Sequence, residues 1–305
     1  MILGSQGLPL TSTTGLEDNA AWFRELLTRY GITPPDNSYV AICLADAEYL
    51  GAKRKGMATS RRPLVNYFFH SRVLGLDYHI RALRRAFEHA DADVFRSHLR
   101  AFRGPNMSLF AKAKRTPERD LAWEFLVGCL VGSFARDLKM TTGPEPDVVC
   151  SHGDLTLGVE CKVLYSDEPD TQMEAIVHGA KQLEASHVDF GFVAAFATNA
   201  TRPGGFQRWP LRKFSTGESA TTDLRREISL SVSGINQEWF LQRLTSDLRT
   251  NRPRFKTRGV LFVAQAVADV QSVTASLTTA VGLSFRDLKV PGCDSFMSSF
   301  ILKPA

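Results

Sequence analysis

The sequence lacks several features that would each assign it to a class. Its five cysteines are scattered and never spaced C-x-x-C, so neither a disulfide framework nor a zinc site is indicated. No apolar run approaches the roughly 20 residues that span a bilayer. The first 16 residues have no basic residue ahead of a hydrophobic stretch, which argues against a secretory signal. These absences predict a cytoplasmic protein without a membrane partner.

Common catalytic signatures are missing as well. The seven histidines show neither H-E-x-x-H nor another zinc-ligand spacing, so structural roles are expected for them. There is no Walker-type phosphate loop and no G-x-S-x-G, so NTPase and serine-hydrolase activities have no support. What is present is an ordinary globular composition, 44% hydrophobic and 23% charged over 305 residues, which can bury a sizeable core.

Acidic residues are scarce in one stretch of the chain. Between residues 51 and 115, 15 Lys or Arg stand against four acids, a local net charge of +11, whereas the whole chain carries +5. Such an excess is typical of a surface that binds a polyanion, although a solvated, arginine-rich helical surface is the alternative. Because the same region has helical periodicity, residues 1–115 are predicted to form a basic, mainly helical domain that binds nucleic acid.

The pattern changes at Thr116, where Thr-Pro-Glu is typical of a helix start. The rest of the chain, 116–305, is predicted to be an α/β domain with a mixed sheet and a long insertion at about 198–258. Apolar runs and turn residues predict its elements in the order helix, three strands, helix, strand. The expected ranges are 116–138, 139–142, 148–151, 155–164, 171–186 and 190–196, followed by two helices in the insertion and a strand at 260–266.

The residues that carry chemistry lie in the segment EPDVVCSHGDLTLGVECKVLYS. Asp147 opens one predicted strand, while Glu160 and Lys162 lie two apart on the next, so alternation points both side chains to one face. If the strands pair as a hairpin, Asp147 lies near Glu160. Buried charges need mutual compensation or a bound cation. Two carboxylates with a backbone carbonyl offer oxygen ligands that suit Mg²⁺.

The segment resembles the PD-(D/E)XK nuclease superfamily in two places. Pro146-Asp147 and Glu160-Cys161-Lys162 match its motif, with 12 residues between the acids. The resemblance implies a restriction-endonuclease-like fold with an αβββαβ core. It also implies that Asp147, Glu160 and the Cys161 carbonyl bind Mg²⁺, for which Mn²⁺ substitutes, and that Lys162 is the catalytic lysine. The alternative is a turn aspartate beside an exposed Glu–Lys pair on an edge strand.

The resemblance implies two further site residues. Many members add a glutamate from the helix before the sheet, and Glu124 is the candidate, both as metal ligand and as catalytic residue; a buried ion pair with Arg119 or Arg136 is the alternative. Some members use a glutamine on the helix after the motif, where Gln182 stands, although it can also be a surface glutamine. The aromatic residue that often follows four positions later is absent, since Ser186 stands there.

The sequence therefore predicts a metal-dependent deoxyribonuclease, with DNA favoured over RNA and with antiviral defence or DNA repair as its setting. Two alternatives stay open. One is a catalytically inactive, nuclease-like module that binds nucleic acid or protein, and the other is an RNA-cutting toxin or effector. Many members of the superfamily pair up to cut both strands, but this sequence has no dimer signature, so a homodimer is left open.

Overall fold

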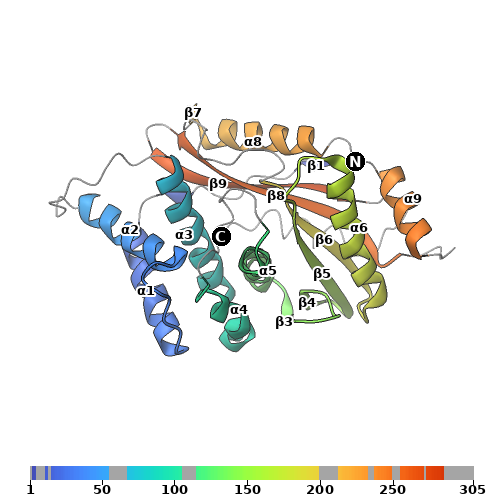
Figure 1. Ribbon diagram of the computed structural model, residues 1–305, viewed down its shortest axis with the longest axis horizontal. Coiled ribbons are helices and arrows are strands. Elements are labelled where there is room, and N and C mark those ends of the chain that lie inside the picture. Colours follow the sequence, from blue (N-terminus) through green and yellow to red (C-terminus); the bar gives the residue numbers. More distant parts are fainter. Residues whose placement is uncertain are drawn as a thin grey trace.

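The computed structural model describes residues 2–4, 11–12, 15–54, 67–104, 115–198, 212–232, 237–248, 255–270 and 273–284. Over these residues the chain is an α/β protein built on one nine-stranded mixed sheet (Figure 1). The strand order is β1-β9-β8-β6-β5-β4-β3, with β2 beside β9 and β7 beside β8. In the described ranges, no helix has both the length and the apolar character needed to cross a membrane.

The centre of the fold follows the predicted order of helix, three strands, helix and strand. β3, β4 and β5 are antiparallel, whereas β5, β6 and β8 run parallel. β6 has the bounds predicted for it, because its apolar run FGFVAAF is buried along its whole length. These elements are α5 (Pro117–Gly132), β3 (Arg136–Met140), β4 (Val148–His152), β5 (Leu155–Val163), α6 (Pro169–Ala185), β6 (Phe190–Phe196) and β8 (Thr257–Val270).

The two faces of the sheet are covered by different helices. On β5, Val159 and Cys161 belong to the hydrophobic core that α5 shares. The intervening residues, Glu160 and Lys162, point to the opposite face, where α6 packs against them at Gly179. The strand therefore alternates as predicted, and its polar residues lie beneath α6.

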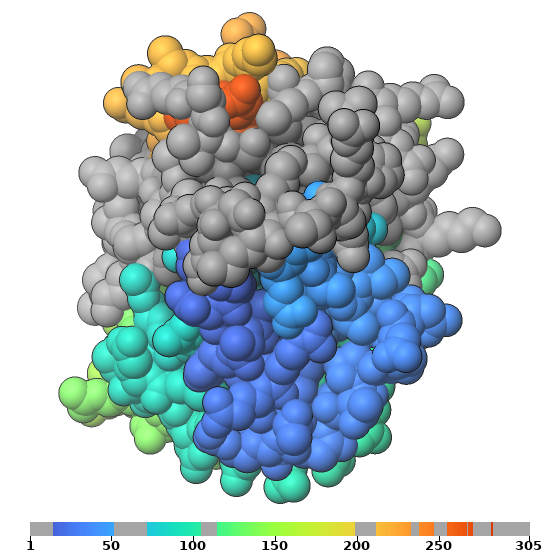
Figure 2. Space-filling model, turned by 90° about the vertical axis from the view of Figure 1, so that its left-hand side faces the viewer, coloured from blue at the N-terminus to red at the C-terminus, as the bar shows by residue number. Residues whose placement is uncertain are grey.

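The region before residue 115 is mainly helical where it is described, as predicted. Its helices share the core of the sheet domain: Phe125 of α5 contacts the rings of Phe95 and Phe102, with centroids 6.1 and 5.1 Å away. α1 and α2 form much of the surface on the left-hand side of Figure 1, which Figure 2 shows face-on. The division into two domains stays a prediction. The helices are α1 (Leu16–Arg29), α2 (Tyr39–Arg54), α3 (Tyr67–Ala86), the 3-10 turn η1 (Ala92–Phe95) and α4 (Arg96–Ala101).

The predicted end of the helix before the sheet is wrong. α5 ends at Gly132, not near residue 138, because the Ser133 hydroxyl donates to the Leu130 carbonyl at 2.7 Å and the backbone then turns away. Asp137 adopts a φ of 50° beside a break in the β3–β4 register, so β3 begins three residues before its predicted start. The last turns of α5 are continuously apolar, so the sequence contains no local signal for the end of the helix at Gly132.

Four strands were not predicted from the sequence. β9 (Val273–Ser284) forms a long antiparallel hairpin with β8, which itself extends well beyond the predicted 260–266. The short strands are β1 (Ile2–Gly4), β2 (Thr11–Ser12) and β7 (Lys213–Phe214). The insertion contains the two predicted helices, α8 (Gly217–Ser231) and α9 (Gln237–Leu248), while residues 199–211 and 249–254 lie outside the described ranges.

Candidate functional site

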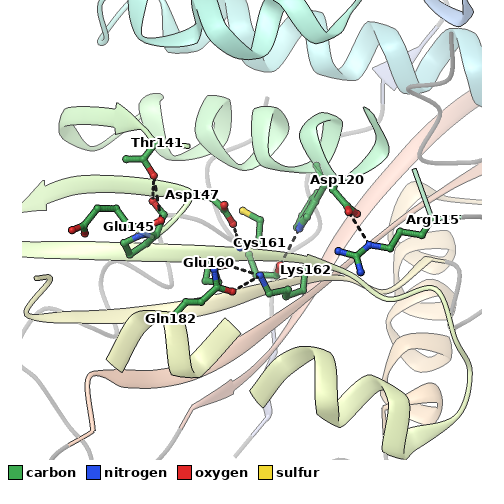
Figure 3. A network of polar contacts seen from close by, with 12 residues as sticks. Arg115, Asp120, Thr141, Glu145, Asp147, Glu160, Cys161, Lys162 and Gln182 are labelled. Atoms are coloured by element: carbon green, nitrogen blue, oxygen red, sulfur yellow. Dashed lines mark hydrogen bonds and ion pairs between the residues drawn. The ribbon is translucent and has the colours of Figure 1, made fainter. Parts of the chain in front are cut away.

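Asp147 lies on the loop immediately before β4, held there by its neighbours. The Thr141 hydroxyl donates to the Pro146 carbonyl at 2.6 Å, and the Thr141 N–H donates to the Asp147 carbonyl at 3.0 Å. Pro146 packs against Gly158, where a Cβ would come within 2.9 Å of its ring. The Asp147 side chain is thereby directed to β5, and its Oδ2 accepts a 2.7 Å hydrogen bond from the Cys161 N–H (Figure 3).

Glu160 and Lys162 form an ion pair on the face covered by α6. The Lys162 ammonium donates to Glu160 Oε1 and also to Gln182 Oε1, the latter at 3.0 Å (Figure 3). Glu160 is only 1% exposed, and β5 lies between β4 and β6. The geometry therefore excludes the alternative of an exposed pair on an edge strand.

Gln182 reaches this pair because α6 lies unusually close to β5. The close approach depends on Gly179, where a Cβ would lie 3.0 Å from Glu160 Cγ and 3.1 Å from Lys162 Cε. Gln182 stands three residues further along the same helix and is partly buried. Its side chain therefore acts as a neutral acceptor that fixes the Lys162 ammonium, unlike a surface glutamine.

The electrostatics show an excess of negative charge around one amine. Burial raises the pKa of Asp147 to about 8, with further contributions from the negative charges of Glu160 and Glu124. Burial also raises the pKa of Glu160, and the Lys162 ammonium opposes this shift. Glu160 Oε2 has no hydrogen-bond partner although it is buried. Two crowded carboxyls and an unsatisfied oxygen are features that a bound cation would relieve.

Glu124 approaches the site from α5 but is bonded to a histidine. Its Oε2 lies 3.2 Å from Nε2 of His98, which is 1% exposed and whose Nδ1 meets the Ser97 hydroxyl at 3.1 Å. The predicted alternative of an ion pair with Arg119 or Arg136 is wrong. Arg119 instead lies over the Tyr165 ring, 5.1 Å from its centroid, and Arg136 is exposed.

The donor set suits a small divalent cation. The Cys161 N–H points toward Asp147, and in a strand the N–H and carbonyl of one residue point to the same side, so the Cys161 carbonyl also faces Asp147. This carbonyl lies beyond Val148–Val159, where the pairing of β4 with β5 ends. Asp147, Glu160 and this carbonyl offer only oxygen ligands, which is the preference of Mg²⁺, an ion that also retains several waters. Over the described ranges, no three His, Cys, Asp or Glu side chains are grouped closely enough to hold a metal by themselves. Water or substrate oxygens would complete the coordination.

Two residues that shape the site were not predicted. Thr141 fixes the loop that carries Asp147, and its place before a Gly-Pro turn is a local signal that could have indicated this role. The sequence predicts only a structural role for His98 and indicates no partner for it. Its contact with Glu124 joins two helices, and no local sequence pattern marks such a contact.

Comparison with known proteins gives no assignment. No protein-family model matches the chain, and neither a curated protein nor a solved structure matches it at a significant level. The function must therefore be inferred from the site itself.

Proposed function

We propose that this chain is a metal-dependent nuclease with a restriction-endonuclease-like fold of the PD-(D/E)XK kind. The observation that carries the proposal is the Lys162 ammonium, which is held between Glu160 and Gln182 on the strand that Asp147 contacts. The element order α5-β3-β4-β5-α6-β6 supports it, since it corresponds to the αβββαβ core that the motif implies. The buried Glu160 Oε2 also supports it, since this oxygen has no hydrogen-bond partner and a bound cation would satisfy it.

In the proposed site, Asp147, Glu160 and the Cys161 carbonyl hold Mg²⁺, and Mn²⁺ substitutes. A cation bound there would neutralise phosphate charge and acidify a bound water. If Glu124 joins as a further ligand while His98 holds its Oε2, the site corresponds to two-metal chemistry; without Glu124 it is a one-metal site.

The side chains of the chain have separate tasks in hydrolysis. Lys162 orients the attacking water and stabilises the charge that develops as a P–O bond forms to the water and the P–O bond to the leaving oxygen breaks. Gln182 keeps the ammonium in place, and because it is neutral it leaves the positive charge of Lys162 uncompensated on that side. Glu160 is buried and Lys162 is mostly shielded from solvent, so the charge interaction between them is stronger than in bulk solvent.

The substrate class follows from charge. The excess of basic residues between 51 and 115 supports a polyanion, and DNA is proposed ahead of RNA. One observation favours the rival, an inactive nuclease-like binding module: Lys162 neutralises Glu160 directly, so this pair is compensated without any cation. The same residues would also serve an RNA-cutting toxin or effector.

A digestion assay tests the proposal. Supercoiled plasmid, single-stranded DNA and RNA are each incubated with wild-type protein in Mg²⁺, Mn²⁺ or EDTA. Cleavage is expected with either metal and not with EDTA. Lys162→Ala should reduce the rate about 100-fold or more, while Lys213→Ala, which removes an exposed lysine on β7, should leave it unchanged. The proposal is wrong if wild type and Lys162→Ala behave alike in every metal.

A further inference from the structure

A basic groove lies between two segments that are distant in the sequence. It has a volume of about 450 Å³ and is formed on one side by η1 and α4 and on the other by β3. Its lining combines three cations, Arg96, Arg100 and Lys139, with one acid, Asp93, the Ser97 hydroxyl and apolar side chains that include Leu138 and Met140.

The charge of the groove is positive and directed to solvent. Arg96, Arg100 and Lys139 are all exposed. Arg100 and Lys139 form no ion pair within the described ranges, and Arg96 lies over the ring of Tyr30, 5.7 Å from its centroid. The acid of the lining, Asp93, is hydrogen-bonded to the Tyr30 hydroxyl. An exposed cation without a carboxylate partner remains available to an anionic ligand.

Both walls of the groove are joined to acids of the proposed site. On the β3 side, Met140 pairs with Val148, and the next residue, Thr141, donates its N–H to the Asp147 carbonyl. On the α4 side, Ser97 contacts His98, which in turn contacts Glu124. The groove therefore shares its walls, β3 and α4, with residues next to those that contact Asp147 and Glu124.

We propose that this groove binds the sugar–phosphate backbone of a nucleic acid and directs it to the site. Arg96 and Arg100 lie one helical turn apart, with Cβ atoms about 5–6 Å from each other, so they can contact neighbouring phosphates. Lys139 contacts the backbone from the opposite wall, and Leu138 and Met140 provide apolar contact for the sugars. This inference rests on the proposed function in that the bound strand is the substrate.

A salt titration of binding tests the inference. The full chain is titrated with a labelled DNA duplex in EDTA, which prevents cleavage, over a range of KCl concentrations. The triple variant R96A/R100A/K139A is compared with R226A/R243A/K213A, which removes three exposed positive charges from β7, α8 and α9, elements that lie away from the groove (Figure 1). The slope of log K against log salt should fall in magnitude by about 2 to 3 for the groove variant, with at least about 10-fold weaker binding, and should keep its wild-type value in the control.

Equal slopes and affinities for the two triple variants would overturn the inference. If the groove triple variant melts below the wild type, the single variants Arg100→Ala and Lys139→Ala replace it, and each should reduce the slope by about 1. Failure here is distinguishable from failure of the proposed function. If the wild type cleaves DNA through Lys162 but the groove triple variant binds DNA as the wild type does, only the groove inference is rejected. If the wild type cleaves nothing but the groove triple variant alone loses DNA binding, the nuclease is rejected and the groove inference is retained.

Discussion

His98 Nε2 lies 3.2 Å from Glu124 Oε2, and this contact joins α4 of the basic N-terminal region to α5, the helix that precedes β3, β4 and β5. Both partners are sheltered, since their side chains are 1% and 17% exposed. Glu124 is thus within electrostatic range of Asp147, whose pKa it helps to raise, while it is held by a different residue. His98 therefore holds one oxygen of this carboxylate.

We predict that His98 is a positioning residue for Glu124. His98→Ala should lower the cleavage rate by about 10-fold or more at limiting Mg²⁺, as loss of a partner that orients a ligand usually does. His98→Gln keeps an amide that can donate to Glu124 and should restore most of the rate. The dependence of rate on Mg²⁺ concentration checks this. Equal losses in both variants at every Mg²⁺ concentration, with equal losses in melting temperature, would show that His98 only fills space.

Metal binding should depend on pH through Asp147. In the metal-free protein the pKa of this carboxyl is raised to about 8, so the group is mainly protonated below that pH, and a cation must displace the proton. Affinity for Mg²⁺ should therefore increase from pH 6 to about pH 8 and then level off. Calorimetric titrations in buffers of different ionisation enthalpy should detect proton release at pH 7. Asp147→Asn should abolish the release; unchanged release in that variant would contradict the assignment.

The same raised pKa has a consequence for stability. A carboxyl whose pKa is higher in the folded than in the unfolded state stabilises the fold at low pH, and this contribution is lost as pH rises through about 8. Metal-free protein should thus melt at a lower temperature at pH 8 than at pH 6 on account of this group, and Mg²⁺ should raise the melting temperature more at pH 8. A shift of about 2 °C or more is expected. In Asp147→Asn the pH dependence of the Mg²⁺ shift should disappear.

Gly179→Ala should impair the site although alanine favours helices. The added methyl group would lie about as close to Glu160 and Lys162 as real contacts allow, and a shift of Lys162 to make room would weaken the Lys162–Gln182 hydrogen bond. We expect a destabilisation of about 1–3 kcal/mol and a reduced cleavage rate. Denaturant unfolding of Gly179→Ala in the wild-type and Lys162→Ala backgrounds provides the check. The loss in unfolding free energy caused by Gly179→Ala should be smaller when Lys162 is truncated to alanine. Equal losses in both backgrounds would show that the methyl group does not clash with Lys162.

The sequence was most informative where one residue pattern decides one local structure. Alternation along 155–164 correctly predicted that Glu160 and Lys162 share a face, and the turn at 152–154 correctly predicted the β4–β5 hairpin that brings Asp147 beside β5. The apolar run at 190–196 fixed both ends of β6, because a strand buried on both faces contrasts sharply with its polar flanks.

Elsewhere, local patterns could not decide the structure. α5 is apolar almost all round, so nothing in its composition marked its end at Gly132. β9 contains three threonines and two valines, but it has no isoleucine or aromatic residue, and its alanines, serines and glycine interrupt the alternation of apolar and polar positions. Partners made by tertiary packing are also invisible to local patterns. His98 meets Glu124, and η1 and α4 meet β3, only because separate helices pack on one core.

The central claim is that Asp147 and Glu160 together hold a divalent cation. A crystal structure of the wild-type protein soaked in Mn²⁺, with anomalous data collected to locate the ion, tests it most directly. We expect an anomalous peak between the two carboxylates, on the side of the Cys161 carbonyl, and its loss in Asp147→Asn. A well-ordered site with no peak there, or with Mn²⁺ bound only at other residues, would contradict the claim.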